Sequence, residues 1–186
     1  MAPRNQNKLI VPPSFVSSSP FPEISAIAAV AENRVISFQN KLPWKISEDL
    51  RWFRGKTKGN TLLIGRKTFE SMGGATALPD SKIIVLSHGG QKFEGADTLT
   101  DWRNLKPDQI QGTLFIGGGQ QVYEELLPYT RYLFLTHVFQ SPIGDRYFPQ
   151  FENRFTQQEV LREEPDKFKI VVYENKNPLP FPARTV

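Results

Sequence analysis

The chain has 186 residues, of which 39% are hydrophobic and 12% aromatic, and this is enough apolar material for one domain with a packed core. Its formal charge of +4 is spread along the chain, so the composition does not indicate a module that binds nucleic acid. Without cysteine there can be no disulfide, thiol nucleophile or cysteine-bound metal, and His88 and His137 are too few for a histidine-rich metal site. No apolar run approaches the roughly 20 residues of a membrane helix. We therefore expect a soluble protein with no metal, and the lack of cysteine favours a cytoplasmic location.

Both ends of the chain are rich in proline. Residues 1–22 hold five prolines and four serines, and they contain no acidic residue. We expect a disordered or surface-draped extension over residues 1–22, a folded domain over residues 23–175 and a proline-broken tail over residues 176–186. The acid-free extension leaves an organellar transit peptide open, but it lacks the apolar stretch of a secretory signal.

Between these ends, short apolar runs alternate with helical patterns. Near-continuous apolar runs are typical of strands that helices cover on both faces, and we expect strands over residues 24–31, 61–65, 82–87, 113–117, 132–138 and 168–174. We expect helices over residues 46–58, 66–72, 99–105 and 120–127. The alternation predicts an α/β fold with a mainly parallel sheet. The last two runs follow each other without a helix, which predicts an antiparallel edge.

The segment LPWKISEDLRWF (42–53) places one acid on an apolar stripe. Ile46, Asp49, Leu50 and Phe53 are spaced i, i+3, i+4 and i+7, so they share one helix face. A carboxylate is expensive to bury unless a partner or ligand uses it. Asp49 is then either a first-turn acid that interacts with the helix dipole, or a buried carboxylate with a raised pKa that binds or protonates a nitrogen-rich ligand.

Two strand ends suit a phosphate group, and a third strand ends beside them. FIGGGQQVYEELLP (115–128) runs from a strand through three glycines into a helix, although it is neither a GxGxxG motif nor a P-loop. GRKTFESM (65–72) places two basic side chains and a hydroxyl at a strand end, and LSH (86–88) ends the next strand. A tight turn or a solvated charge pair would explain each one alone. Together with Asp49 they suggest a phosphate-bearing cofactor beside a cationic heterocycle, outside the carboxyl ends of the strands.

In order and spacing, several motifs together resemble dihydrofolate reductase: ISAIAAVAENRVI, NKLPWKISEDLRWF, GRKTFESM, the Leu78-Pro79 pair, IGGGQQVYEELLP, LTHV and GDRYFP. They span about residues 24–174. The resemblance implies an NADPH-dependent oxidoreductase of one-carbon metabolism, with a mixed, mainly parallel eight-stranded sheet flanked by helices. Such an enzyme reduces 7,8-dihydrofolate to 5,6,7,8-tetrahydrofolate, with hydride added to C6 and a proton to N5. The resemblance further implies a monomer that binds pterin or folate substrates and antifolate inhibitors, and neither nucleic acid nor membrane.

The resemblance also assigns residues to the site. Asp49 would pair with N3 and the 2-amino group of the pterin, Thr136 would hydrogen-bond this acid, and Leu42 and Trp44 would belong to a mobile loop over the nicotinamide. The expected substrate-binding residues are Ile27, Ala28, Asp49, Leu50, Phe53, Arg54, Met72, Leu78, Ile116, Tyr123 and Thr136. The expected cofactor-binding residues are Ala29, Ile36, Ser37, Gly65, Arg66, Lys67, Thr68, Leu86, Ser87, His88, Ile116, Gly117, Gly118, Gly119, Gln120, Gln121, Val122 and Tyr123. A cis peptide bond is expected at Gly117–Gly118, and a loop that supports the mobile one at Gly144 and Asp145.

The chain also departs from the family pattern. Ser81 stands where the family has the arginine that clamps the α-carboxylate of the glutamate tail, and loss of such a charge-assisted pair costs about 2–5 kcal/mol. Arg54, on the acid-bearing helix, is the expected substitute. Segment 73–77 is slightly longer than usual, Gln120-Gln121 includes an extra residue and lacks the basic residue often found there, and Ser37 replaces a common glycine.

Three alternatives stay open. A reductase of the same fold could act on another pterin or on a riboflavin-pathway pyrimidine, although the pyrimidine enzymes do not characteristically have an acid at the position of Asp49. A non-catalytic relative could have kept the cofactor pocket after losing turnover. A nucleic-acid binder is the third alternative, and the dispersed charge of the chain disfavours it.

Overall fold

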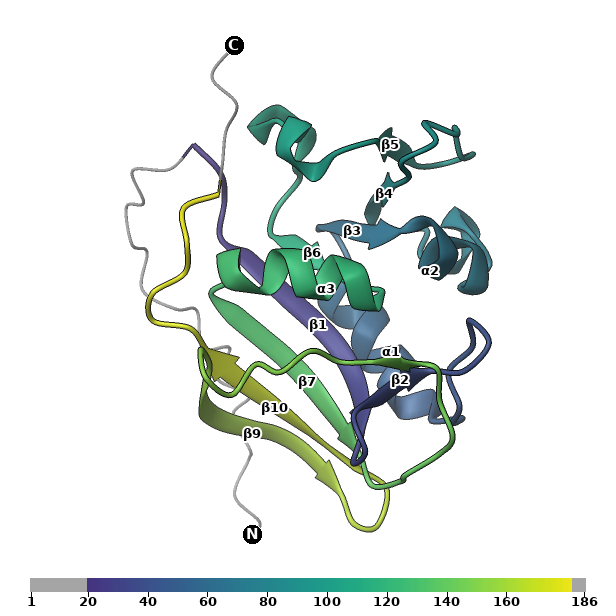
Figure 1. The fold of residues 1–186 in the computed structure, drawn as a ribbon, viewed down its shortest axis with the longest axis vertical. Coiled ribbons are helices and arrows are strands. Elements are labelled where there is room, and N and C mark those ends of the chain that lie inside the picture. Colours follow the sequence, from purple (N-terminus) through teal and green to yellow (C-terminus); the bar gives the residue numbers. More distant parts are fainter. Residues whose placement is uncertain (1–19, 182–186) are drawn as a thin grey trace, which may run out of the picture.

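An eight-stranded mixed sheet organises the protein, as seen in the computed structural model, which describes residues 20–181 (Figure 1). The strand order is β5-β4-β3-β6-β1-β7-β10-β9, and all neighbours from β5 to β7 are parallel. β10 runs antiparallel to β7 and β9 antiparallel to β10, so the predicted α/β fold and antiparallel edge are confirmed. The strands of this sheet are β1 (Ile24–Ala31), β3 (Thr61–Gly65), β4 (Lys82–Leu86), β5 (Asp97–Leu99), β6 (Leu114–Ile116), β7 (Tyr132–Val138), β9 (Thr156–Glu164) and β10 (Phe168–Glu174).

Helices cover both faces of the sheet (Figure 1). Side chains alternate between the faces of β1, so Ala26 and Ala28 pack in the core cluster that includes Tyr123 of α3, whereas Ile27 packs with Phe69 of α2 and Phe53 of α1. Burial on both faces explains why the strand reads as a continuous apolar run. The helices are α1 (Ser47–Thr57), α2 (Arg66–Ser71) and α3 (Gln120–Leu126), with short 3₁₀ turns η1 (Ala75–Ala77), η2 (Trp102–Asn104), η3 (Pro107–Gln109) and η4 (Leu127–Tyr129).

The helix predicted over residues 99–105 is wrong. Leu99 ends β5 and pairs with Leu86 of β4, and only the 3₁₀ turn η2 follows. The Asp101 side chain accepts a hydrogen bond from the backbone N–H of Arg103, a local cap that favours a short turn, and Pro107 follows closely. Strands β5 and β9 of this sheet were not predicted from the sequence. β9 is exposed along almost its whole length, so it carries no apolar run that would mark it.

The two ends of the described chain meet on the core. Residues 1–19 of the predicted extension and residues 182–186 of the final tail lie outside the described residues. Phe21 is buried, and its ring centroid lies 4.9 Å from that of Phe181. Phe181 also packs 5.3 Å from Trp102, and the backbone N–H of Leu179 donates to the carbonyl of Pro128. Within residues 20–181, no helix has the length and apolar character needed to cross a bilayer.

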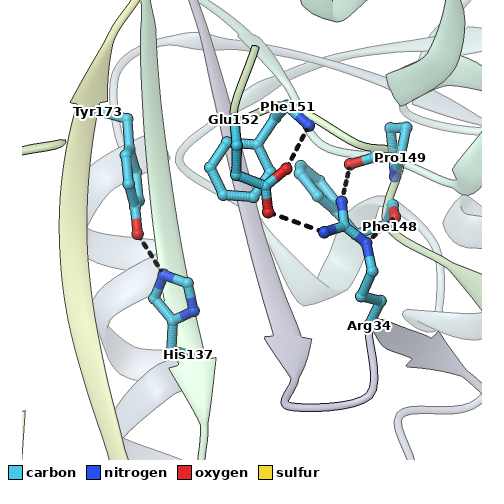
Figure 2. Close-up of polar contacts among 7 residues, drawn as sticks. All are labelled: Arg34, His137, Phe148, Pro149, Phe151, Glu152 and Tyr173. Atoms are coloured by element: carbon cyan, nitrogen blue, oxygen red, sulfur yellow. Dashed lines mark hydrogen bonds and ion pairs between the residues drawn. The ribbon is translucent and has the colours of Figure 1, made fainter. Parts of the chain in front are cut away.

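A second, two-stranded sheet of β2 (Val35–Ser37) and β8 (Arg146–Tyr147) is fastened by Arg34 (Figure 2). The Arg34 guanidinium donates to the carbonyls of Phe148 and Pro149, and to Glu152 Oε1 at 2.8 Å. In return, the backbone N–H of Phe148 donates to the Arg34 carbonyl at 2.8 Å. One side chain thus joins the start of β2 to the segment that follows β8.

A partly buried hydrogen bond links β7 to β10 beside this network (Figure 2). His137 Nε2 and the Tyr173 hydroxyl are 2.7 Å apart. Burial lowers the pKa of His137 to about 4, and the nearby Lys169 contributes in the same direction. His137 is therefore uncharged at neutral pH and belongs to the packing of the sheet rather than to a charged site.

Replacing Arg34 by glutamine should lower the free energy of unfolding by about 2 kcal/mol, because charged hydrogen bonds to two half-buried carbonyls and an exposed ion pair with Glu152 are lost. Urea unfolding at pH 7 measures the change. Arg162 provides the control, since its ion pair with Glu164 is exposed on β9 and its replacement by glutamine should cost less than about 1 kcal/mol. Equal losses in the two variants would contradict the fastening role of Arg34.

Candidate active site

A cavity of about 220 Å³ lies between α1, β1 and the loop that follows β2, and its lining is mainly apolar. Seven helices and strands and the loops beside them contribute residues to it, so the cavity forms only when the chain is folded. The predicted site residues that line it are Ile27, Ala28, Ala29, Ile36, Ser37, Leu42, Asp49, Leu50, Phe53, Lys67, Thr68, Met72, Gly117, Gly118, Gly119, Tyr123 and Thr136.

Asp49 is the only carboxylate in the lining of this cavity. It is 7% exposed and accepts a 2.7 Å hydrogen bond at Oδ1 from the hydroxyl of Thr136, which β7 holds beside β1. Burial raises the pKa of the Asp49 carboxyl, and the hydrogen bond from Thr136 partly opposes this rise. No ion pair within residues 20–181 includes Asp49. Of the two alternatives from the sequence, the geometry therefore favours the buried carboxylate.

The glycine-rich turn after β6 brings backbone to the cavity. The cis peptide bond joins Gly118 and Gly119, so its prediction at Gly117–Gly118 is wrong by one residue. The reason is that Gly117 still donates to the carbonyl of Leu63 in the sheet at 3.0 Å, and the turn begins only after it. At Gly118 φ is 107°, and a Cβ there would lie 3.1 Å from the ring of Tyr123, so glycine is required. The Tyr123 hydroxyl donates to the carbonyl of Ile27 at 2.7 Å, which ties α3 to β1 at the cavity wall.

A second cavity, of about 880 Å³, continues from the first past the ends of β3 and β4. Its lining carries the basic side chains of Arg66, Lys67, His88, Arg103 and Arg146. The two cavities share four lining residues: Lys67, Thr68, Gly119 and Arg146. An elongated ligand with one anionic half therefore fits the pair. The predicted residues that line the second cavity are Gly65, Arg66, Lys67, Thr68, Leu86, Ser87, His88, Gly119, Gln121 and Val122.

Some predicted site residues lie outside both cavities. Trp44 is buried in a cluster with Val35, and Leu78 and Ile116 are buried in the two clusters beside the sheet. Arg54 is exposed on α1. The side chain of Gln120 is occupied: its Oε1 accepts from the backbone N–H of Tyr147, and its amide donates to Glu124.

Other lining residues were not predicted. In the first cavity these are Asn40, Lys41, Trp52, Ser71 and Arg146. In the second they include Gly89, Gln91, Thr100, Asp101, Trp102, Arg103 and Glu125. Several stand inside the motifs already quoted, such as Trp52 beside Phe53 and Arg146 in GDRYFP, but a motif alone does not say which way each side chain points.

The loop that follows β2 is held by the segment just before β8, as the resemblance implies for Gly144 and Asp145. The backbone N–H of Asp145 donates to the Ser37 carbonyl, and Asp145 Oδ2 accepts from the backbone N–H of Gln39, both at 3.0 Å. A Cβ on Gly144 would lie 2.3 Å from Val35 Cγ1, so the two segments approach too closely for a residue larger than glycine at position 144. These contacts place the loop with Leu42 over the cavity.

Ser81 has a structural role at the end of α1. Its hydroxyl donates to the carbonyl of Thr57 at 3.0 Å, and the Thr57 hydroxyl in turn donates to the carbonyl of Phe53. The Thr57 carbonyl also accepts from the backbone N–H of Asn60, so these bonds reinforce the C-terminal turn of α1. Ser81 therefore holds the end of the acid-bearing helix and provides no positive charge near the cavity.

The fold and the joined cavities define a reductase that uses a nicotinamide dinucleotide, with the acid in one cavity and the basic side chains in the other. The family model described as dihydrofolate reductase matches residues 23–176. The chain therefore belongs to the dihydrofolate reductase family, the family that its motifs resemble, and is an NADPH-dependent oxidoreductase.

Relatives support this assignment along most of the chain. The dihydrofolate reductase of Buchnera aphidicola subsp. Acyrthosiphon pisum is 39% identical over 132 residues, which cover 69% of this chain and 80% of the relative. That of Bacillus subtilis is 34% identical over 163 residues, covering 83% and 95%. The structure of dihydrofolate reductase from Enterococcus faecalis complexed with NADP(H) and RAB-propyl is similar at a TM-score of 0.72 and 29% identity, covering 83% of this chain and 96% of that one.

Asp49→Asn should stabilise the fold more strongly as the pH rises. The raised pKa means that ionised Asp49 costs stability above its usual pKa of 3.8, and asparagine removes this cost while its Oδ1 can still accept from Thr136. Thermal unfolding from pH 4 to pH 8 tests the trend. Glu48→Gln is the control with the opposite sign, because its own backbone N–H and the Ser47 hydroxyl lower the pKa of exposed Glu48. A stabilisation by Asp49→Asn that does not change with pH would contradict the assigned pKa.

Proposed function

We propose that the protein reduces 7,8-dihydrofolate to 5,6,7,8-tetrahydrofolate with NADPH, adding hydride to C6 and a proton to N5. The observation that carries this proposal is the buried carboxylate of Asp49, bonded to Thr136 in a mainly apolar cavity. A carboxylate in such surroundings favours a ligand that brings it hydrogen-bond donors or positive charge. The N3 position and the 2-amino group of a pterin ring provide such donors.

Asp49 and Thr136 would divide the work of binding and protonation. The Thr136 hydroxyl occupies Oδ1 of Asp49, which leaves Oδ2 for the ligand. Because burial raises the pKa of this carboxyl, Asp49 takes up a proton closer to neutral pH than an exposed aspartate does. Such a group suits the protonation of a ring nitrogen, for which the acid's pKa should approach the working pH. The apolar walls, which include Ile27 and Phe53, exclude water from the reacting ring.

The second cavity supports NADPH as the cofactor, which when bound supplies the hydride. Arg66 and Lys67 bring positive charge to this cavity, and the additional phosphate of NADP, compared with NAD, would use that charge. The turn that includes Gly119 brings backbone close to the ligand path, where a Cβ on Gly119 would lie 3.2 Å from Thr68 Oγ1. The loop with Leu42 would cover the nicotinamide half.

Ser81 supports a second candidate substrate, a dihydropterin without a glutamate tail. The hydroxyl of Ser81 is bonded to the carbonyl of Thr57, so it is not available to bind a carboxylate. Arg54 is exposed on the same helix as Asp49, and it is our candidate for holding the tail of dihydrofolate. A pyrimidine substrate of the riboflavin pathway stays disfavoured by Asp49.

We expect the enzyme to act as a monomer and to bind antifolates, as the resemblance implies, and the lack of cysteine favours the cytoplasm as its location. The Enterococcus faecalis relative was solved with NADP(H) and RAB-propyl. That complex supports small molecules as the ligands of the two cavities.

Asp49→Asn should lower turnover with dihydrofolate by about 10²–10⁴-fold, because the variant loses the group that holds and passes a proton. NADPH oxidation under saturating substrate measures turnover, and the Kd for NADPH should stay within about twofold of wild type. Glu48→Gln, which replaces the neighbouring exposed acid, is the control and should keep its turnover. Near-normal turnover by Asp49→Asn at neutral pH would contradict the assignment.

Arg54→Gln should raise KM for dihydrofolate by up to about fivefold, the effect of losing an exposed ion pair of about 1 kcal/mol. It should leave kcat/KM unchanged for a dihydropterin that lacks the glutamate tail. Measuring kcat/KM for both substrates, in wild type and variant, tests whether Arg54 holds the glutamate tail. If the wild type has the higher kcat/KM for the tail-less pterin, the substrate is the second candidate. If the variant loses kcat/KM equally for both substrates, Arg54 does not hold the tail.

A further inference from the structure

Arg146 on β8 stands where the two cavities meet. It lines both of them, together with Lys67, Thr68 and Gly119. A dinucleotide that extends from one cavity into the other has to pass these four residues. The part of NADPH between its adenosine and nicotinamide halves is the diphosphate bridge, so the shared lining is the natural position for that group.

Most N–H donors of the Arg146 guanidinium make no hydrogen bond among the described residues. Two other arginines of the larger cavity are paired with acids, Arg66 with Glu70 at 3.1 Å and Arg103 with Asp101 at 3.2 Å. Arg146 takes part in none of the ion pairs found between residues 20 and 181, and its Nη1 donates to the carbonyl of Asp145 at 2.7 Å. An arginine has five N–H donors in a fixed plane that matches phosphate oxygens. Most of its donors therefore stay free for an anion.

The backbone that carries Arg146 is held in place from two sides. Arg146 pairs with Ser37 of β2, and the N–H of the next residue, Tyr147, donates to Gln120 Oε1 at 2.9 Å. The second bond ties β8 to the first residue of α3. Neither Gln120 nor Gln121 carries a charge, so Arg146 brings to this corner of the site a positive charge that the start of α3 lacks.

We propose that Arg146 binds the diphosphate bridge of NADPH. This inference rests on the proposed function, because it assumes NADPH in the joined cavities. Arg146 then determines cofactor affinity at the centre of the dinucleotide, whereas Arg66 and His88 lie toward its adenosine end. Its contact with the cofactor also reaches the loop over the substrate cavity, because its backbone pairs with Ser37 where that loop begins.

The experiment measures NADPH binding without turnover, by calorimetry on the full chain. Arg146→Gln should raise the Kd for NADPH about tenfold, which corresponds to about 1.4 kcal/mol. Arg146→Lys keeps the charge but loses the planar pair of donors, and it should fall between wild type and the glutamine variant. Adenosine 2′-monophosphate, which has no diphosphate bridge, should bind all three proteins within twofold. Arg162→Gln, far from the cavities on β9, is the matched control and should bind NADPH as the wild type does.

An unchanged Kd for NADPH in Arg146→Gln would overturn the proposal. So would an equal loss of affinity for adenosine 2′-monophosphate, since the effect would then not come from the bridge. Wild-type protein that binds NADPH but does not reduce dihydrofolate would overturn the proposed substrate and leave the Arg146 result standing. Wild-type protein that does not bind NADPH would overturn both.

Discussion

The carboxylate of Asp49 is the constraint on which the site depends. It is buried without an ion pair among the described residues, and the hydroxyl of Thr136 is the hydrogen-bond partner that holds it. Such an arrangement costs folding free energy, because a charge loses water without gaining a countercharge. A protein keeps it where a ligand uses the acid. The walls of the cavity, the loop over it and the turn after β6 line the same cavity as this one group.

Much of the fold could be predicted from sequence, because the central strands are buried on both faces. β1, β3, β4, β6, β7 and β10 are continuous apolar runs, and their bounds were predicted to within about a residue. The exposed β9 and the short β2, β5 and β8 carry no such pattern. They form because neighbouring strands offer free hydrogen-bonding edges, and this is a property of the assembled sheet.

The site was predictable only in part, for a similar reason. The stripe of Ile46, Asp49 and Phe53 indicated where the acid lies, and the basic residues of GRKTFESM indicated the second cavity. The contribution of Arg146 to both cavities depends on how β8 packs against β2 and α3, which no local spacing encodes. The three consecutive glycines likewise did not fix the position of the turn, because Gly117 still belongs to the sheet.

The contacts that complete the site join residues far apart along the chain. Thr136 and Asp49 are 87 residues apart, and Arg34 and Phe148 are 114 apart. β1, the first strand, lies between β6 and β7, so both of its neighbours are synthesised long after it. The topology therefore has a high contact order, and closing such long loops slows folding. While the chain emerges from the ribosome, β1 has neither of its neighbouring strands until about residue 114, where β6 begins. Asp49 likewise has no hydrogen-bond partner in Thr136 until that residue is made. Through most of translation this molecule is thus a chain with an exposed apolar strand, and such a species is prone to aggregation.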